Sequence, residues 1–408
     1  MQKSIGSDVH IVAFNTSADV ASDVTVVNTS YQLKPAIGTP MEALRDLIER
    51  TCPAQMDRLI AHVRGEFEST PDSFDRNVTR HVRLTNSFLA ALETHAPDHV
   101  FLWNQFNALH RHFAHILDLR GIPRSFFHDG LLPGSIAMDL DGEMGESWIA
   151  RDPERFQAIP VTSDDRGRAA DFLAHLKTMD LHRHVQVDGV SVQEMIAINR
   201  RHDRPLVFYA GQADWHAGLR PDGPDRALHS PFYKSSLEAL ADLDRLAGEM
   251  GFYLLFKPHP LSRDRHVFLA AEDYPNTLIL SSVTLQSCID AAQVVVTIAS
   301  QTCYVALMAG KPVVMLGRNQ LTGKGLTYDL QARDALADTL LRALSDPLGA
   351  DRAENLADHV ARLEQIYLFD YGTLDVNFYR RGAEAAADLV RSCVAPHGTS
   401  PQDVLSHS

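Results

Sequence analysis

A short polar turn follows an apolar segment in the second half of the chain. Val294–Ile298 is too short to span a membrane and is typical of a buried parallel strand. Ser300, Gln301 and Thr302 follow, where the strand gives way to a predicted helix. Ligands of open α/β sheets bind outside the carboxyl ends of the strands, and a helix N-terminus favours an anion. The turn is therefore a candidate binding site for the phosphate of a nucleotide or of another phosphorylated ligand.

A second candidate for phosphate binding follows the predicted strand Phe252–Phe256. Lys257 and His259 alternate there with two prolines that restrict the backbone, in the order K-P-H-P. Either side chain can neutralise a phosphate or diphosphate leaving group. A lone histidine is more often structural, but a histidine between two prolines after a buried strand favours a functional role.

A carboxylate follows the predicted strand Arg124–Phe127 in the first half of the chain. The segment His128–Gly134 reads H-D-G-L-L-P-G, so that Asp129 precedes a loop containing glycine and proline. A carboxylate at such a position can act as nucleophile or general base in glycosyl chemistry. Asp-Gly is also a common turn dipeptide. The residues alone support a catalytic role and a turn-forming role for Asp129 equally.

Several other residues are weaker candidates. Gln212 and Asp214 follow the predicted strand Pro205–Tyr209 and offer an amide and a carboxylate, but on their own they favour a loop role. Cys303 lies at the start of a predicted helix, where a thiol pKa can be lowered, although a small buried packing residue is the favoured interpretation. The segment Asp139–Asp141 matches a D-x-D metal pattern, but the Asp-Gly pairs around it favour a turn.

Three histidines lie on one predicted helix, Phe106–Leu119, and could suggest a zinc site. His110 and His115 do not have the spacing of four residues that would place two ligands on one face. A polar or partly buried helix face is therefore favoured. The G-x-G-x-x-G and G-x-x-x-x-G-K-[ST] patterns are both missing from the sequence, which weighs against an ordinary NAD or FAD enzyme and against a P-loop NTPase.

The composition is that of a soluble globular protein. A formal net charge of −14 argues against a general nucleic-acid binder, which would present a basic surface. The four cysteines are far apart, so neither a zinc knuckle nor a disulfide framework is expected. The start of the sequence lacks an apolar secretory region, and no run approaches the roughly 20 apolar residues of a membrane span. We expect a cytoplasmic protein.

Strand-like and helix-like segments alternate through both halves, which is typical of an α/β protein with parallel sheets. We expect two Rossmann-like domains that face each other across a cleft. The first comprises residues 1–200 and the second comprises residues 201–375. A helix at 376–394 is expected to pack back on the first domain, and the tail at 395–408 is expected to be disordered.

Together these segments resemble the bacterial capsular polysaccharide biosynthesis glycosyltransferases, especially the β-Kdo transferases. That family shows E-D-G-F-L-R-S where His128–Gly134 reads H-D-G-L-L-P-G, and P-G-Q-x-x-x-D where Ala210–Asp214 reads A-G-Q-A-D. It shows Y-K-P-H-P where Phe256–Pro260 reads F-K-P-H-P. It also shows T-x-T-S-x-x-G-F-E-A-L-x-x-G-K-P-V and G-x-G-L-T-x-D, which correspond to Thr297–Val313 and Gly323–Asp329.

The resemblance implies a GT-B fold, an acceptor-side first domain and a nucleotide-sugar-binding second domain. It also implies a CMP-linked donor such as CMP-Kdo, a glycan or lipid-linked acceptor, and no metal or other cofactor. Asp129 would be the catalytic carboxylate, assisted by His128. The donor nucleotide and phosphate would be bound by Gln212, Lys257, His259, Ser300, Gln301 and Thr302. A lipid-linked acceptor would bring the protein to the inner face of the cytoplasmic membrane without a spanning helix.

The sequence departs from the family pattern in three places. His128 replaces a glutamate, Pro133-Gly134 replaces Arg-Ser, and Cys303–Ala306 replaces Gly-Phe-Glu-Ala, which removes a carboxylate near the nucleotide ribose. The donor could therefore be another sugar acid, another nucleotide sugar or a polyol phosphate. Two alternatives stay open: a polyol-phosphate or sugar-phosphate transferase of teichoic-acid type, and a non-catalytic nucleotide-sugar-binding subunit.

Overall fold

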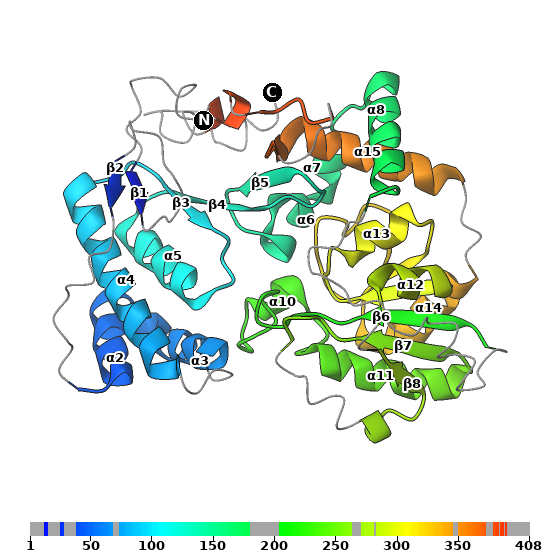
Figure 1. Cartoon of the computed structure of the whole chain (residues 1–408), viewed down its shortest axis with the longest axis horizontal. Helices are drawn as coiled ribbons and strands as arrows, with labels where there is room; N and C mark the ends of the chain where they lie inside the picture. Colours follow the sequence, from blue (N-terminus) through cyan, green and yellow to red (C-terminus); the bar gives the residue numbers. More distant parts are fainter. Residues whose placement is uncertain are drawn as a thin grey trace. The chain divides into compact units, whose positions relative to one another are not determined.

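The chain divides into two compact units (Figure 1). The computed structural model describes residues 12–14, 25–27, 38–67, 73–179, 204–262, 271–280, 283–345, 350–372, 378–382, 384–386 and 388–389. Unit 1 comprises Met1–Glu143 and Leu363–Ser408, and unit 2 comprises Met144–Arg362. The predicted tail at 395–408 lies outside the described residues, as does part of the predicted helix at 376–394.

The boundaries between the units differ from the predicted ones at 200 and 375. Residues 144–179 are part of unit 2, where Arg166 donates hydrogen bonds to Asp358 at 2.6 and 3.0 Å and forms an ion pair with Glu354 at 2.8 Å. Helical periodicity shows that a segment has an apolar face, but it does not show which unit that face covers. The position of the boundary was therefore not readable from the pattern.

Within the described residues, unit 2 is built on a six-stranded parallel sheet in the order β11-β10-β9-β6-β7-β8. The strands are β6 (Leu206–Ala210), β7 (Tyr253–Lys257), β8 (Thr277–Ile279), β9 (Val294–Thr297), β10 (Val313–Met315) and β11 (Tyr328–Asp329). Every residue of β6, β9 and β10 is buried. Such continuous apolar strands are expected where both faces of a parallel sheet are covered, and the predicted α/β class is confirmed.

The strand order of unit 2 reverses between β6 and β9. From β6 the chain proceeds outward through β7 and β8, then returns to the other side of β6 and proceeds outward again through β9, β10 and β11. In open α/β sheets, ligands bind at the carboxyl ends of the strands that flank such a reversal. The terminal residues Ala210, Lys257 and Thr297 are in register across β6, β7 and β9, so these three strands end at one level.

Helices cover both faces of this sheet. One face packs against α11 (Ser236–Met250) and α14 (Leu336–Leu344) in a buried cluster that joins Tyr209, Leu240 and Leu340. Figure 1 shows α11 on one side of β6 and β7, and α12 (Leu285–Ala291) and α13 (Thr302–Met308) on the other. The other described helices of unit 2 are α6 (Trp148–Arg151), α7 (Pro153–Gln157), α8 (Ser163–Leu176), α10 (Arg226–His229) and α15 (Ala350–Ile366), whose last turn enters unit 1, with the short 3-10 turns η3 (Met144–Glu146), η5 (Ala271–Asp273) and η6 (Arg333–Ala335).

Unit 1 contains a four-stranded mixed sheet in the order β12-β5-β4-β3. The strands are β3 (Val100–Trp103), β4 (Arg124–Asp129), β5 (Ser135–Asp139) and β12 (Leu368–Asp370). The parallel strands β3 and β4 are joined by α5 (Ala108–Arg120), as the predicted βαβ alternation requires. The strand β5 pairs antiparallel with β4 and with β12, and neither β5 nor β12 was predicted. A separate parallel pair consists of β1 (Val12–Phe14) and β2 (Thr25–Val27).

The helical layer of unit 1 consists of α2 (Pro40–Thr51), η1 (Pro53–Gln55), α3 (Met56–Phe67), α4 (Phe74–His95) and α5. The helices α2 and α3 are interrupted at Cys52, because a residue that precedes proline disfavours the helical conformation. Thr39 and Glu42 form a reciprocal capping box at the start of α2. Asn107 accepts a hydrogen bond from His110 N at the start of α5.

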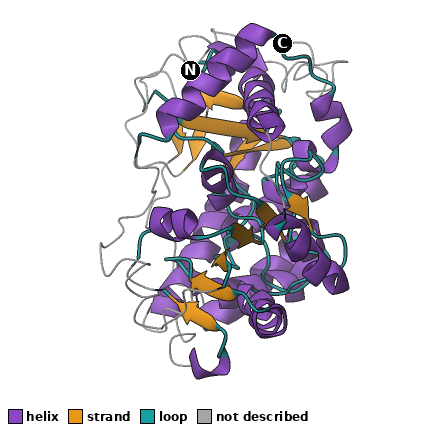
Figure 2. Ribbon diagram, turned by 90° about the vertical axis from the view of Figure 1, so that its right-hand side faces the viewer, coloured by secondary structure: helices purple, strands orange, loops and turns teal. Residues whose placement is uncertain are grey.

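The C-terminal segment completes unit 1. Phe369 of β12 and Leu389 pack with Met138 of β5 in one buried cluster, with Phe101 and Phe127 at its edge. Figure 2 shows the arrangement of helices and strands from a second direction. Within the residues that the structure describes, no helix is long and apolar enough to cross a membrane.

The surroundings of two glycines in unit 2 predict opposite effects on stability when each is replaced by alanine. A Cβ on Gly317 would lie 2.4 Å from the carbonyl oxygen of His229 and 2.9 Å from that of Ile298, so Gly317→Ala should destabilise the protein by about 1–3 kcal/mol. Gly167 lies inside α8, and a Cβ there would meet nothing within 4 Å, so Gly167→Ala should stabilise by about 0.5–1 kcal/mol. Thermal denaturation checks both signs, and equal shifts for the two variants would contradict the described packing.

Candidate functional site

The strand reversal of unit 2 brings the predicted donor-binding residues to one edge of the sheet. Gln212 lies two residues after β6, and Lys257 is the last residue of β7, with His259 two residues beyond it. Ser300–Thr302 follows β9 on the other side of β6. Because these strands end at one level, the structure gathers all six predicted donor residues at the place where open α/β sheets bind ligands.

Hydrogen bonds from both sides fix the backbone of the turn after β9. Gln212 Oε1 accepts from Ala299 N at 3.2 Å, and this bond directly spans the reversal between β6 and β9. Asn319, in the loop after β10, donates from Nδ2 to Ala299 O at 3.3 Å. Asn319 belongs to no motif, so only the structure could identify it. The turn is therefore preorganised by two buried amide side chains.

The polar side chains of the turn are half-buried and bond to one another. Ser300 Oγ lies 3.1 Å from Thr302 Oγ1 and accepts from Thr302 N at 3.3 Å. Thr297 Oγ1 accepts from Ser300 N at 3.3 Å. Gln301 is the N-cap residue of α13, which has seven residues. The arrangement presents hydroxyl and amide groups that can exchange these local bonds for bonds to an anionic ligand.

The K-P-H-P loop begins with the last residue of β7 and therefore lies at the same edge of the sheet as the Ser300–Thr302 turn. Burial lowers the pKa of Lys257, and the nearby Cys288 thiol opposes that shift. His259 Nδ1 accepts from Leu261 N at 3.1 Å, so the proton of the neutral ring is on Nε2. Gly211 N donates to Lys257 O at 2.9 Å, and a Cβ on Gly211 would lie only 2.9 Å from that oxygen. Glycine is therefore required beside Lys257.

Two other predicted candidates of unit 2 have structural roles. Both carboxylate oxygens of Asp214 accept from Ser236 N, at 3.0 and 3.2 Å, at the start of α11. Cys303 is fully buried, and burial raises the pKa of its thiol to about 12. A buried thiol with a raised pKa is a poor nucleophile, which agrees with the favoured interpretation of Cys303 as a packing residue.

The two predicted catalytic residues of unit 1 have opposite environments. Asp129 is the last residue of β4 and is exposed, whereas His128 is buried. Neighbouring residues of a strand point to opposite faces of the sheet, so only one of them could face outward. His128 Nδ1 donates to Asp129 O at 2.9 Å, and His128 Nε2 lies 3.0 Å from the Tyr367 hydroxyl. The His128 ring therefore positions the backbone of Asp129.

A carboxylate is present near position 128 although the glutamate of the family pattern is replaced there. Glu143 Oε1 lies 3.6 Å from His128 Nδ1. Tyr367 and Glu143 were not predicted, because Tyr367 comes from the distant C-terminal segment and Glu143 from a segment without a motif. The loop after Asp129 is mostly buried: Leu131 and Leu132 are in the core, and Pro133 O accepts from the Tyr379 hydroxyl at 2.6 Å.

The remaining candidate metal ligands of unit 1 are packing groups. His112 is fully buried between Thr51 Oγ1 and His81 Nε2, each at 3.0 Å, and burial lowers the pKa of His112 and of His115 to about 4. Asp139 Oδ1 accepts from the backbone of Asp141 and Gly142, as in the predicted turn. Among the described residues, no group of three or more His, Cys, Asp and Glu side chains is placed to hold a metal ion.

A buried lysine anchors the glycine-rich loop between β10 and β11. Lys324 Nζ donates to Ile149 O at 2.8 Å and to Thr322 O at 3.2 Å, and it lies 5.1 Å from the centre of the Phe156 ring. Burial lowers the Lys324 pKa to about 7, although Asp329 acts in the opposite direction. Lys324 thereby ties this loop to α6 and α7 inside unit 2.

Comparison with known proteins places this site in a family context. Residues 166–345 match a family model described as capsule polysaccharide biosynthesis protein. The predicted family resemblance is confirmed over this segment. It contains all six predicted donor residues and lies within unit 2, whereas Asp129 lies outside it. No curated protein matches the chain.

Solved structures with partial similarity include two β-Kdo transferases of Thermosulfurimonas dismutans KpsC. The 2,7 transferase is 18% identical with a TM-score of 0.44, and the match covers 67% of this chain and 79% of that one. The 2,4 transferase is 15% identical with a TM-score of 0.41, covering 64% and 79%. A UDP-GlcNAc 2-epimerase of Methanocaldococcus jannaschii is 12% identical with a TM-score of 0.33, covering 67% and 79%.

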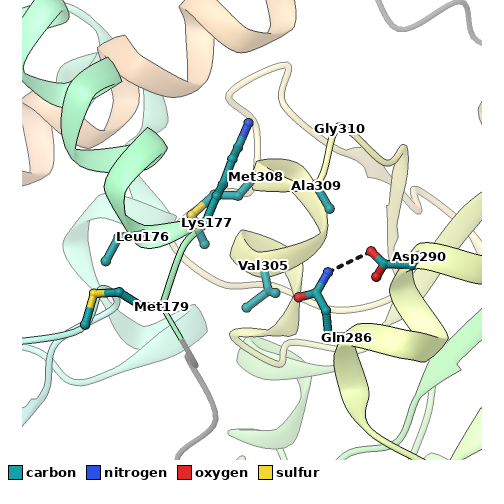
Figure 3. Close-up of a pocket in the computed structure, with 9 residues that line it drawn as sticks. All are labelled: Leu176, Lys177, Met179, Gln286, Asp290, Val305, Met308, Ala309 and Gly310. Carbon is teal, nitrogen blue, oxygen red and sulfur yellow. Dashed lines mark hydrogen bonds between the residues drawn. The ribbon is translucent and has the colours of Figure 1, made fainter.

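Val305 lines a pocket of about 380 Å³ (Figure 3). The capsule family pattern has a glutamate at this position. The pocket is lined by Leu176, Lys177, Met179, Gln286, Asp290, Val305, Met308, Ala309 and Gly310. Gln286 Nε2 donates to Asp290 Oδ1 at 2.7 Å on its wall. Gly310 precedes the amino end of β10, so the pocket is distinct from the site at the carboxyl ends of the strands.

Lys324 predicts a specific pH dependence of stability. Between about pH 7 and pH 10 the folded chain has lost the Lys324 proton, whereas the unfolded chain retains it. Because the folded pKa lies below the unfolded one, the unfolded chain binds more protons over this range, and stability rises with pH. The thermal midpoint of the wild type relative to Lys324→Met should therefore increase by about 5 °C from pH 6 to pH 9.

The control for this measurement is Lys234→Met, which removes an exposed lysine of the same unit. Its thermal midpoint relative to the wild type should change little over that range. A difference between wild type and Lys324→Met that is constant from pH 6 to pH 9 would show that the lysine is not buried in its neutral form.

Proposed function

We propose that this protein is a glycosyltransferase of capsule or other surface-polysaccharide assembly. It transfers a sugar from a nucleotide-sugar donor to a glycan or glycolipid acceptor. The observation that carries the proposal is the gathering of Gln212, the K-P-H-P loop and the Ser300–Thr302 turn at the strand reversal of unit 2. The family match over residues 166–345 supports it independently.

Unit 2 binds the donor in this proposal. Lys257 and His259 supply positive charge or N–H donors to the phosphate, opposite the hydroxyls of Ser300 and Thr302. These groups stabilise the negative charge that develops on the nucleotide phosphate as the glycosidic bond breaks. Gln212 acts mainly by holding the turn, because its Oε1 is bonded to Ala299 N. A metal ion is not needed when cationic side chains neutralise the phosphate.

A CMP-linked sugar such as CMP-Kdo is the proposed donor. The support is the family resemblance carried by the K-P-H-P and G-K-G-L-T-Y-D segments, together with the parallel sheet of unit 2. Val305 stands where the family pattern has glutamate, so this position offers the donor ribose no carboxylate. A lipid-linked acceptor would place the enzyme at the inner face of the cytoplasmic membrane.

Asp129 is the proposed catalytic carboxylate. Its exposure at the end of β4 leaves it accessible to a sugar, and the buried His128 ring holds its backbone oxygen. In a retaining reaction Asp129 would attack the anomeric carbon as nucleophile, and in an inverting reaction it would take the proton of the acceptor hydroxyl. His128 is a positioning residue in both cases, because it is buried against Tyr367.

The role of His259 is tested by nucleotide binding. We expect His259→Ala to weaken CMP binding about tenfold, because a charge-assisted hydrogen bond to phosphate contributes about 1.5–3 kcal/mol. Calorimetric titration of CMP into wild type and variant measures the difference. His95→Ala, an exposed histidine at the end of α4, is the control and should bind CMP as the wild type does. Equal affinities for all three proteins would rule out the phosphate contact.

The role of Asp129 is tested by turnover. We expect Asp129→Asn to reduce the rate of CMP release from CMP-Kdo at least 100-fold, since loss of a nucleophile or general base removes that much or more. CMP affinity should be retained, because the donor residues all lie in unit 2. Asp98→Asn, an exposed carboxylate of unit 1, should retain turnover. Wild-type turnover in Asp129→Asn would refute the assignment of this carboxylate.

A further inference from the structure

Trp103 is an exposed aromatic residue at the carboxyl end of β3 in unit 1. Its exposed fraction is 43%, whereas Trp148 is 6% exposed. Tryptophan is highly buried on average, so Trp103 is more exposed than is typical of its residue type. Its position adjoins the strand that ends in the proposed catalytic Asp129.

The strand register places Trp103 and Asp129 on the same face of the sheet. Trp103 pairs with Phe127 of β4, and Asp129 lies two residues beyond Phe127. Paired residues of adjacent strands share a face, and so do residues two apart on one strand. Diagonal neighbours of this kind have backbone positions about 7–8 Å apart. The indole and the carboxylate therefore project from neighbouring positions on one face of the sheet.

The backbone that carries Trp103 is firmly held. Asn104 N donates to Phe127 O at 2.8 Å, and Asn104 Oδ1 accepts from Phe106 N at 3.0 Å. His110 Nδ1 accepts from Asn107 Nδ2 at 2.8 Å in the turn that follows. Asn104 has a positive φ of 46°, a conformation that these bonds stabilise. The turn therefore presents Trp103 in a defined position.

The exposure of Trp103 is not shared by the rest of its face. Phe101 and Phe127, on the same face, pack at the edge of the cluster formed by Met138, Phe369 and Leu389. Among the described residues, the C-terminal segment packs on the middle of the face, whereas Trp103 and Asp129 at its carboxyl end are exposed. A rigid aromatic platform beside a carboxylate suits a ligand with an apolar face and a ring of hydroxyl groups.

We propose that Trp103 is a binding platform for a pyranose ring of the acceptor glycan, which stacks its C–H face on the indole beside Asp129. The proposal rests on the glycosyltransferase function and names the acceptor class as a pyranoside. Stacking on a rigid aromatic ring gives affinity with little loss of side-chain freedom. A hydroxyl group of the stacked sugar would then lie within reach of the Asp129 carboxylate, which is the group that an acceptor base must contact.

The proposal is tested by titrating soluble methyl glycosides of glucose, galactose, N-acetylglucosamine and Kdo into the full-length protein. The chain has three tryptophans, so binding can be followed by intrinsic fluorescence. At least one glycoside should change the emission of the wild type. The same glycoside should bind Trp103→Ala roughly tenfold more weakly by calorimetry, and Trp103→Tyr should restore much of the affinity.

Leu119→Ala is the matched control, since Leu119 is a large exposed apolar residue of the same unit, 64% exposed on α5. It should bind the glycoside as the wild type does. The proposal is overturned if no glycoside of the panel binds the wild type, or if Trp103→Ala binds as tightly as the wild type. CMP affinity should be the same in all variants. Trp103-dependent glycoside binding without any nucleotide binding would reject the transferase function and retain the sugar platform.

Discussion

The reversal of strand order between β6 and β9 is the constraint on which the organisation of unit 2 depends. Two parallel strands that lead outward in opposite directions leave their carboxyl ends free of a crossover helix. Gln212 and Ala299 meet across this place through one hydrogen bond between a side chain and the backbone. The reversal of strand order also sets the positions of the loops that follow β7 and β10 and of the turn that follows β9.

Much of unit 2 could be predicted from the sequence because its strands are continuous apolar runs. Val294–Thr297 and Leu206–Ala210 are buried on both faces, so their composition alone identifies them. In unit 1 the same reasoning missed β5. Its sequence, Ser135–Asp139, contains polar residues at both ends and follows a tight hairpin, so it read as part of a turn. The partner β12 is distant in sequence, and local patterns cannot report such pairing.

The positions of the candidate site residues could be predicted better than their surroundings. The predicted donor residues lie at one edge of the sheet because each segment follows a strand, which is a local property. His128 and Asp129 were grouped as catalytic because they are adjacent, yet alternation along β4 buries one and exposes the other. Asn319, Tyr367 and Lys324 act through contacts with distant segments, and no spacing in the sequence announces such contacts.

Unit 1 is formed by the first and the last segments of the chain, and this has a consequence for biosynthesis. The strand β5 is made early, but its neighbour β12 emerges only after the whole of unit 2 has been synthesised. Until then β5 has an open edge, and an open strand edge invites pairing with other chains. Unit 2 is continuous and can complete its sheet first. During synthesis the edge of β5 is thus unpaired until β12 has been made. A chaperone or rapid completion of the chain would protect this edge from pairing with other chains.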